Sequence, residues 1–80
     1  MRIRYSDNFA RASKLLSHET KKILKEKLEI MAVNLQDSSL HSKKIQGQED
    51  IYEIHITENI RMTWQHTEDG IFLRNIGNIE

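Results

Sequence analysis

The apolar residues of this chain change their spacing near residue 40, and that change limits what the chain can fold into. Before it, the apolar residues recur every three or four positions: Phe9, Ala12, Leu15 and Leu16, then Leu24, Leu28, Met31 and Leu35. Such spacing is typical of helices with one apolar side. After it, apolar and polar residues alternate and β-branched residues dominate in residues 51–56, 60–65 and 71–76, which predicts strands.

The first half of the chain contains start and stop signals for these elements. Residues 2–6 alternate and predict a short strand, after which Ser6 or Asp7 is placed to accept hydrogen bonds from the free amides of a helix. A break near Ser17 starts the second, longer helix, so we expect a helical hairpin. The predicted fold is α+β: a strand, the helical hairpin and a three-stranded antiparallel meander (β-α-α-β-β-β), with the helices packed on one sheet face.

The connection between the second and third predicted strands fixes their register. A two-residue loop would place apolar and polar residues on the same side of the sheet, because a shift by one residue reverses every side chain. An odd loop over residues 57–59, with Asn59 in the left-handed region, instead sets Ile56 opposite Ile60 and His55 opposite Arg61.

Composition limits the classes of protein and of site. The 80 residues contain no proline and three glycines, so we expect one domain over residues 1–80 without a linker. There is no cysteine, and the four histidines lack the spacing of a zinc site, so we expect neither a metal nor a small-molecule cofactor. The chain shows no long apolar run and no apolar leader, from which we expect no membrane span and a cytoplasmic location.

The charges are unevenly spread, although they sum to zero. Residues 1–47 carry ten Lys or Arg and five Asp or Glu, a net charge of +5, and residues 48–80 carry the opposite net charge. A lysine-rich helix could meet nucleic acid or an acidic partner. It could equally be an ordinary solvated helix face.

The polar positions of the predicted strands bring together groups that suit a phosphodiester. Glu53, His55 and Arg61 would share the sheet face turned away from the helices. Cleavage of a phosphodiester by a neighbouring hydroxyl needs a base, an acid and a fixed cation, roles that Glu53, His55 and Arg61 respectively could fill. The alternative is that these three side chains only pair across a half-solvated sheet.

Two further residues on the last strand suit contact with a nucleic acid. Phe72 could stack on a base, and Arg74 follows two residues later on the same face. Trp64 shares its parity with Ile60 and Met62, so we expect it in the core.

The order of these motifs resembles that of a known family. The segments that carry the resemblance are Phe9 with Leu15-Leu16, the basic lead from Leu40 to Gly47, Ile51-Tyr52-Glu53, Ile60 to Trp64, and Ile76-Gly77. Together they resemble the RelE-type toxins of bacterial and archaeal toxin–antitoxin modules, within the RelE/ParE superfamily. The resemblance implies the fold predicted above, a cognate antitoxin as partner, and inhibition of translation by cleavage of mRNA on the ribosome.

The resemblance also assigns roles and marks departures from the family. It implies that Lys43 and Lys44 contact RNA phosphates and that Arg61 lies on the scissile phosphate, with Glu53 in the same cleft. His55 stands where an arginine is frequent. Ile79 stands where a histidine or arginine is expected. Two alternatives therefore remain: a catalytically weak homologue that mainly binds an antitoxin, and a ParE-like inhibitor of DNA gyrase.

Overall fold

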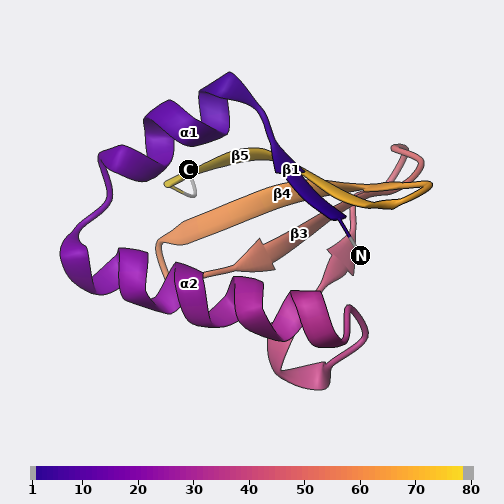
Figure 1. Ribbon diagram of the computed structural model, residues 1–80, viewed down its shortest axis with the longest axis horizontal. Coiled ribbons are helices and arrows are strands. Elements are labelled where there is room, and N and C mark those ends of the chain that lie inside the picture. Colours follow the sequence, from indigo (N-terminus) through magenta and orange to yellow (C-terminus); the bar gives the residue numbers. More distant parts are fainter. Residues whose placement is uncertain (1, 79–80) are drawn as a thin grey trace.

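The computed structural model describes residues 2–78 as a five-stranded sheet with two helices on one of its faces (Figure 1). In chain order the elements are β1 (Arg2–Tyr5), α1 (Asp7–Lys14), α2 (His18–Val33), the 3-10 helix η1 (Ser38–Leu40), β2 (Lys43–Lys44), β3 (Ile51–His55), β4 (Ile60–Thr67) and β5 (Gly70–Asn78). The predicted α+β class is confirmed. The two helices diverge from their short connection, and α1 packs against β5.

Serine side chains start both helices, as their positions in the sequence predict. The Ser6 hydroxyl accepts a hydrogen bond from the Phe9 amide at 3.0 Å and donates one to the Arg74 carbonyl at 2.6 Å. The Ser17 hydroxyl accepts from the Thr20 amide at 3.1 Å. Ser6 therefore satisfies a free amide of α1 and also fixes the start of this helix on β5.

The apolar side of the first helix is shorter than its spacing predicts. Leu15 was expected on it, but this side chain is 87% exposed, so that prediction is wrong. The reason is local: α1 ends at Lys14, and the Leu15 amide already closes the last turn on the Ala12 carbonyl. The chain therefore turns away before Leu15 can reach the sheet, whereas Phe9 is buried.

The sheet contains two strands more than the predicted meander. Its order is β1-β5-β4-β3-β2, with β1 parallel to β5 and all other neighbours antiparallel. The predicted first strand thus joins the same sheet beside the last strand, and the basic segment at Lys43–Lys44 forms a short edge strand on β3. Alternation within a strand predicts the strand but not its distant partner.

The register predicted for β3 and β4 is confirmed. His55 lies opposite Arg61 and Ile54 opposite Met62, and the Ile56 amide donates to the Ile60 carbonyl at 2.8 Å. The apolar residues of both strands therefore share the face that the helices cover, as burial requires.

The conformation predicted for the connecting loop is wrong. Asn59 does not have a positive φ; among residues 2–78 the non-glycine residues that do are His41 and Asp50. The Thr57 hydroxyl closes the loop instead, since it accepts from the Asn59 amide at 3.2 Å and from the Ile60 amide at 3.1 Å. The Thr57 side chain thus supplies the hydrogen bonds that close this loop, so Asn59 does not need a left-handed conformation.

A β-bulge interrupts the pairing of β4 with β5. Thr63 lies opposite Asn75 while Trp64 lies opposite Leu73, so Arg74 is an extra residue on β5. The bulge reverses the alternation along β5. Leu73 faces the core, and the next buried side chain is that of Ile76, three residues later.

One apolar cluster between the sheet and the helices holds the fold together. Its fully buried side chains come from α2, from η1 and from three strands: Met31, Leu40, Ile54, Met62, Ile71 and Leu73. This arrangement leaves the opposite face of the sheet free of helices (Figure 1). No helix within residues 2–78 has the length and apolar character needed to cross a bilayer.

Candidate functional site

The three predicted catalytic side chains meet on the sheet face that carries no helix. The guanidinium of Arg61 donates from Nη1 to Oε2 of Glu53 at 3.0 Å. The other carboxylate oxygen of Glu53 lies 4.0 Å from Nε2 of His55. Because His55 pairs with Arg61 across the strands, Glu53 reaches Arg61 on the diagonal and lies between the two basic side chains.

These three side chains differ in how much water reaches them. The Glu53 side chain is 19% exposed, while those of Arg61 and His55 are 49% and 57% exposed. The register also places Lys43 of β2 directly opposite Glu53. One partly buried carboxylate is thus surrounded by three basic side chains that remain open to solvent, which favours an anionic ligand on this face.

A hollow of about 220 Å³ lies beside Arg61. It is lined by Arg61 and Thr63 of β4 and by residues 75–78 of β5. Gly77 is the residue directly opposite Arg61, and a Cβ added there would meet no atom within 4 Å. The absence of a side chain at this position keeps the space next to the guanidinium open.

A second hollow, of about 240 Å³, adjoins the first. The two share Thr63 and Asn75, and the second is also lined by Arg74 and by Ile45, Gln48 and Ile51. The bulge explains why Arg74 lines the second hollow, because the extra residue brings Arg74 and Asn75 together beside Thr63. Arg61 and Arg74 therefore flank a shared polar floor made by Thr63 and Asn75.

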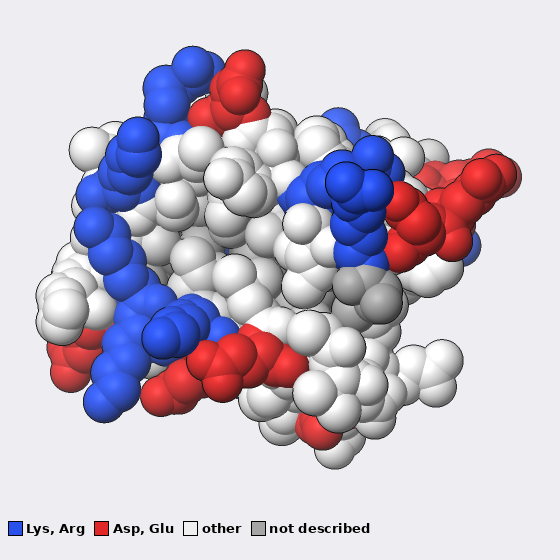
Figure 2. All heavy atoms as spheres, viewed as in Figure 1, with Lys and Arg blue, Asp and Glu red and all other residues white. Residues whose placement is uncertain are grey.

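A separate group of basic side chains lies on the helical layer. Figure 2 shows Lys and Arg along the outer side of α1 and the first half of α2. The exposed basic residues of these segments are Arg11, Lys14, Lys21, Lys22 and Lys25. This basic helix strip is distinct from the group around Arg61, which belongs to the opposite face of the sheet.

Comparisons with known proteins find similarity in structure and not in sequence. No protein-family model matches the chain, and no curated protein matches it. Several solved structures do match the chain in fold. RelE in the RelB–RelE antitoxin–toxin complex of Methanococcus jannaschii superposes with a TM-score of 0.82 and 21% identity, over 94% of this chain and 88% of that one. The Escherichia coli DinJ–YafQ complex gives 0.82 and 17%, over 96% and 91%. The isolated E. coli RelE toxin gives 0.80 and 18%, over 98% and 83%.

This is the RelE-type toxin fold. The fold implied by the sequence resemblance is thereby confirmed, although the identities are too low to carry the activity of those proteins to this chain. The RelE-type fold of this chain holds Glu53, His55, Arg61 and Lys43 in one place.

The other residues predicted for the site are spread more widely. Lys44 pairs with Tyr52, so alternation places it on the side of the sheet that carries the helices, opposite to the side of Lys43. Phe72 lies toward the other end of β5, opposite Gln65 and beside Arg4 of β1. Ile79 lies outside the described residues. Residues 2–78 contain no group of three His, Asp or Glu side chains that could hold a metal ion.

Two asparagines in the site were not singled out from the sequence. Asn75 and Asn78 line the hollow beside Arg61, and both amides can donate as well as accept hydrogen bonds. The signal available in the sequence was weak, because strict alternation from Leu73 predicts Asn75 on the buried face. Only the bulge places Asn75 on the same face as Arg61.

Proposed function

We propose that this chain is the toxin of a type II toxin–antitoxin module, a single domain over residues 1–80 that acts in the cytoplasm and inhibits translation by cutting mRNA on the ribosome. One observation carries the proposal. Arg61, Glu53 and His55 meet beside an open hollow on a face that the RelE-type fold leaves uncovered.

The proposed reaction uses the RNA's own 2′-hydroxyl as nucleophile and needs no cofactor. The Glu53 carboxylate takes the proton of this hydroxyl, and the 2′-oxygen forms a bond to phosphorus. The bond from phosphorus to the 5′-oxygen breaks, and protonated His55 gives its proton to that oxygen. The products are a 2′,3′-cyclic phosphate and a free 5′-hydroxyl. Each proton transfer of this kind typically contributes about 10²–10⁴-fold to the rate.

Arg61 stabilises the charge that grows on the phosphate. Its contact with Glu53 uses Nη1, and a guanidinium has five N–H donors in all. The remaining donors can bind the phosphate while Glu53 stays in place. The ion pair thus positions the base beside the phosphate as well as holding the cation.

The other basic residues would hold the RNA strand on either side of the cleaved bond. Lys43 lies next to Glu53, and Arg74 lies at the far side of the shared polar floor. Phe72 is half-buried on the same strand as Arg74, and its ring would stack on a base beyond it. Lys44 would bind a phosphate on the other side of β2.

We also propose that a cognate antitoxin binds this chain. RelE and YafQ were solved in complexes with the antitoxins RelB and DinJ, on the same fold as this chain. The basic helix strip fits an acidic partner, whether an antitoxin segment or ribosomal RNA.

The test is expression without an antitoxin, followed by mapping of mRNA ends on ribosomes. We expect growth arrest and new 5′ ends within translated codons, and loss of both with Arg61→Ala. Arg2→Ala is the matched control, because Arg2 is an exposed arginine on β1, at the opposite edge of the sheet from β2, and pairs with Gly70. Growth without arrest, together with intact mRNA at confirmed expression, would refute the nuclease.

A second candidate is a homologue that binds an antitoxin and cleaves little. The observation that favours it is the ion pair itself, since Glu53 and Arg61 satisfy each other in the free protein. Under this alternative, antitoxin binding is tight while Arg61→Ala changes nothing in the cleavage assay.

A further inference from the structure

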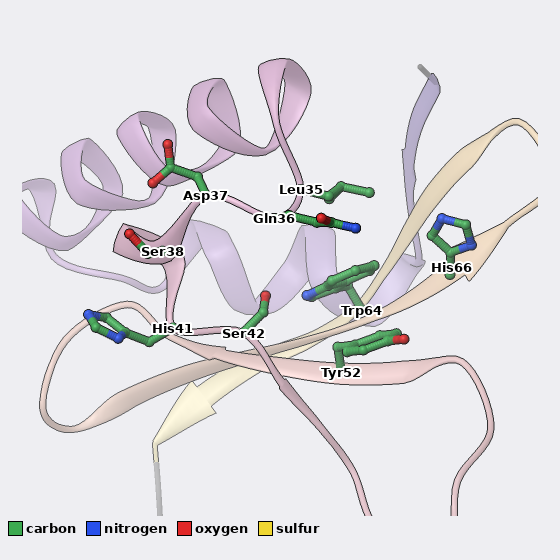
Figure 3. A pocket seen from close by; sticks show the side chains of 9 residues that line it. All are labelled: Leu35, Gln36, Asp37, Ser38, His41, Ser42, Tyr52, Trp64 and His66. Atoms are coloured by element: carbon green, nitrogen blue, oxygen red, sulfur yellow. The ribbon is translucent and has the colours of Figure 1, made fainter.

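A cavity of about 430 Å³ lies on the helical side of the sheet (Figure 3). Alternation along β4 places Arg61 on the other side. The walls of the cavity are residues 35–38, His41 and Ser42 on one side and Tyr52, Trp64 and His66 on the other. The volume falls within the range of small-ligand sites, roughly 300–1,000 Å³. The catalytic proposal makes no use of this cavity.

Trp64 gives the cavity a fixed hydrogen-bond donor. The residue is 3% exposed, and its ring stacks on that of Tyr52 with centroids 4.6 Å apart and planes inclined by 17°. Its indole Nε1 is buried, and no acceptor from residues 2–78 reaches it. Figure 3 shows this nitrogen at the end of the ring that is turned toward Ser42 and the cavity. Buried donors are nearly always paired, so an unpaired one that faces a cavity indicates a ligand that accepts its hydrogen bond.

The other groups around the cavity define the ligand further. Among residues 2–78 no lysine or arginine lines the cavity, so an anionic group inside it would lack the partner that such a side chain provides. The carboxylate of Asp37 accepts hydrogen bonds from Ser39 and is turned away from Trp64 (Figure 3). In the view of Figure 3, the amide of Gln36 lies above the Trp64 ring. The hydroxyl of Ser42 lies on the side of the ring that carries the indole nitrogen. The amide and the hydroxyl can both donate and accept. A neutral ring whose edge carries both hydrogen-bond acceptors and donors fits the groups of Gln36, Ser42 and Trp64.

A positively charged residue lies beside one wall of the cavity without lining it. Ser42 is followed directly by β2, and Lys44 of β2 pairs with Tyr52 on the cavity side of the sheet. Lys44 is exposed. A ligand with a neutral ring inside and a phosphate outside would meet both features, whereas a neutral peptide would leave the lysine without a role.

We propose that this cavity binds a nucleobase, with the Trp64 indole N–H donating to an acceptor on the base and Lys44 holding the attached phosphate. The base belongs to a free nucleotide or to single-stranded RNA. The RNA source rests on the proposed function, because mRNA held at Arg61 would then pass around the short β2 edge and place one base on the helical side.

Trp64 is the only tryptophan of the chain, so its fluorescence reports on this cavity alone. The probes are the four ribonucleoside 5′-monophosphates, ribose 5-phosphate, and a short single-stranded RNA whose 2′-O-methyl groups prevent cleavage. We expect a saturable change in emission with nucleotides or RNA and none with ribose 5-phosphate. Tighter binding of RNA identifies a strand as the source, and equal binding identifies the free nucleotide. An equal response to ribose 5-phosphate would overturn base recognition.

Two variants test the cavity without touching the catalytic group. Ser42→Leu fills it from an exposed position, and we expect affinity to fall at least about tenfold. Gln46→Leu is the matched control, because it makes a similar change at an exposed position outside the cavity and should bind as the wild type does. Trp64→Phe keeps an aromatic ring and removes the donor, and equilibrium dialysis should show a loss of about three- to tenfold.

The remaining outcomes separate this proposal from the proposed function. Cleavage of mRNA without any Trp64 response to nucleotides or RNA refutes the base site and leaves the nuclease. A Trp64 response without cleavage supports the base site and refutes the nuclease. A response to an antitoxin peptide but to neither nucleotides nor RNA assigns the cavity to a protein interface, and the base site is then wrong.

Discussion

Replacing each glycine of the chain by alanine makes the same chemical change in three different surroundings. A Cβ at Gly70 would lie 1.9 Å from the carbonyl oxygen of Arg2 and 2.6 Å from its nitrogen. These are backbone atoms of β1, which pairs with β5 from this point onward. The side chain cannot be accommodated by a rotamer change, so β1 has to move away from β5.

The magnitudes follow from those surroundings. Displacing the start of β1 breaks roughly two to four backbone hydrogen bonds at about 1 kcal/mol each, which gives ~2–4 kcal/mol for Gly70→Ala. Gly47 has a φ of +81° but open space around it, so alanine there costs only the left-handed conformation, about 1 kcal/mol. Gly77 has neither a positive φ nor a neighbour in the way, and alanine there should change stability by less than ~0.5 kcal/mol or raise it slightly.

Urea denaturation followed by Trp64 fluorescence measures all three variants. Because Trp64 is 3% exposed in the folded chain, its emission should shift on unfolding. Equal slopes with different midpoints would show that the variants differ in stability alone. The steric reasoning is refuted if Gly70→Ala unfolds at the wild-type midpoint, or if Gly77→Ala loses as much as Gly70→Ala.

Three further predictions test the site and the core. Gly77→Leu should fold normally and reduce mRNA cleavage at least about tenfold in the ribosome assay, because its side chain enters the hollow beside Arg61; unchanged cleavage would place the RNA elsewhere. Met31→Ala should cost about 2–5 kcal/mol in urea denaturation because Met31 is fully buried, whereas Leu15→Ala should change stability by less than ~0.5 kcal/mol because Leu15 is exposed. Equal losses would contradict the different burial of these two side chains. Hydrogen bonds from the Ser39 hydroxyl and amide hold the pKa of Asp37 below its ordinary value. Their contribution is therefore present above about pH 4 and lost as the pH falls through the lowered pKa, so the stability difference between wild type and Asp37→Asn should shrink in acid; a constant difference would show that the carboxylate charge plays no part.

The candidate site could be predicted in part, because register follows from burial. Once the apolar residues of β3 and β4 must share a face, the loop between them must be odd, and His55 then falls opposite Arg61. The direct contact of Arg61 is nevertheless with Glu53, on the diagonal. Alternation gives the face of a residue and its partner, but side-chain rotamers decide which of several polar neighbours it binds.

The errors in the sequence analysis have a common physical origin. The end of α1 at Lys14, the hydroxyl of Thr57 in the loop, and the extra residue Arg74 on β5 are each settled by hydrogen bonds that depend on the geometry around them. Periodicity is a pattern over many residues, so it cannot detect where a helix ends to within one residue or where a strand contains one extra residue.

The sequence by itself determined the two helices and four of the five strands, their order, the face that each of these strands buries and the group of Glu53, His55 and Arg61. These follow from local periodicity, because a helix and a strand repeat at different intervals and each must hide its apolar side. Only the tertiary structure decided that β1 lies beside β5, that the bulge turns Asn75 toward Arg61, and that Lys43 and Lys44 face opposite sides of the sheet. Those features depend on contacts between residues distant in the chain, and the cavity at Trp64 exists only where such segments meet.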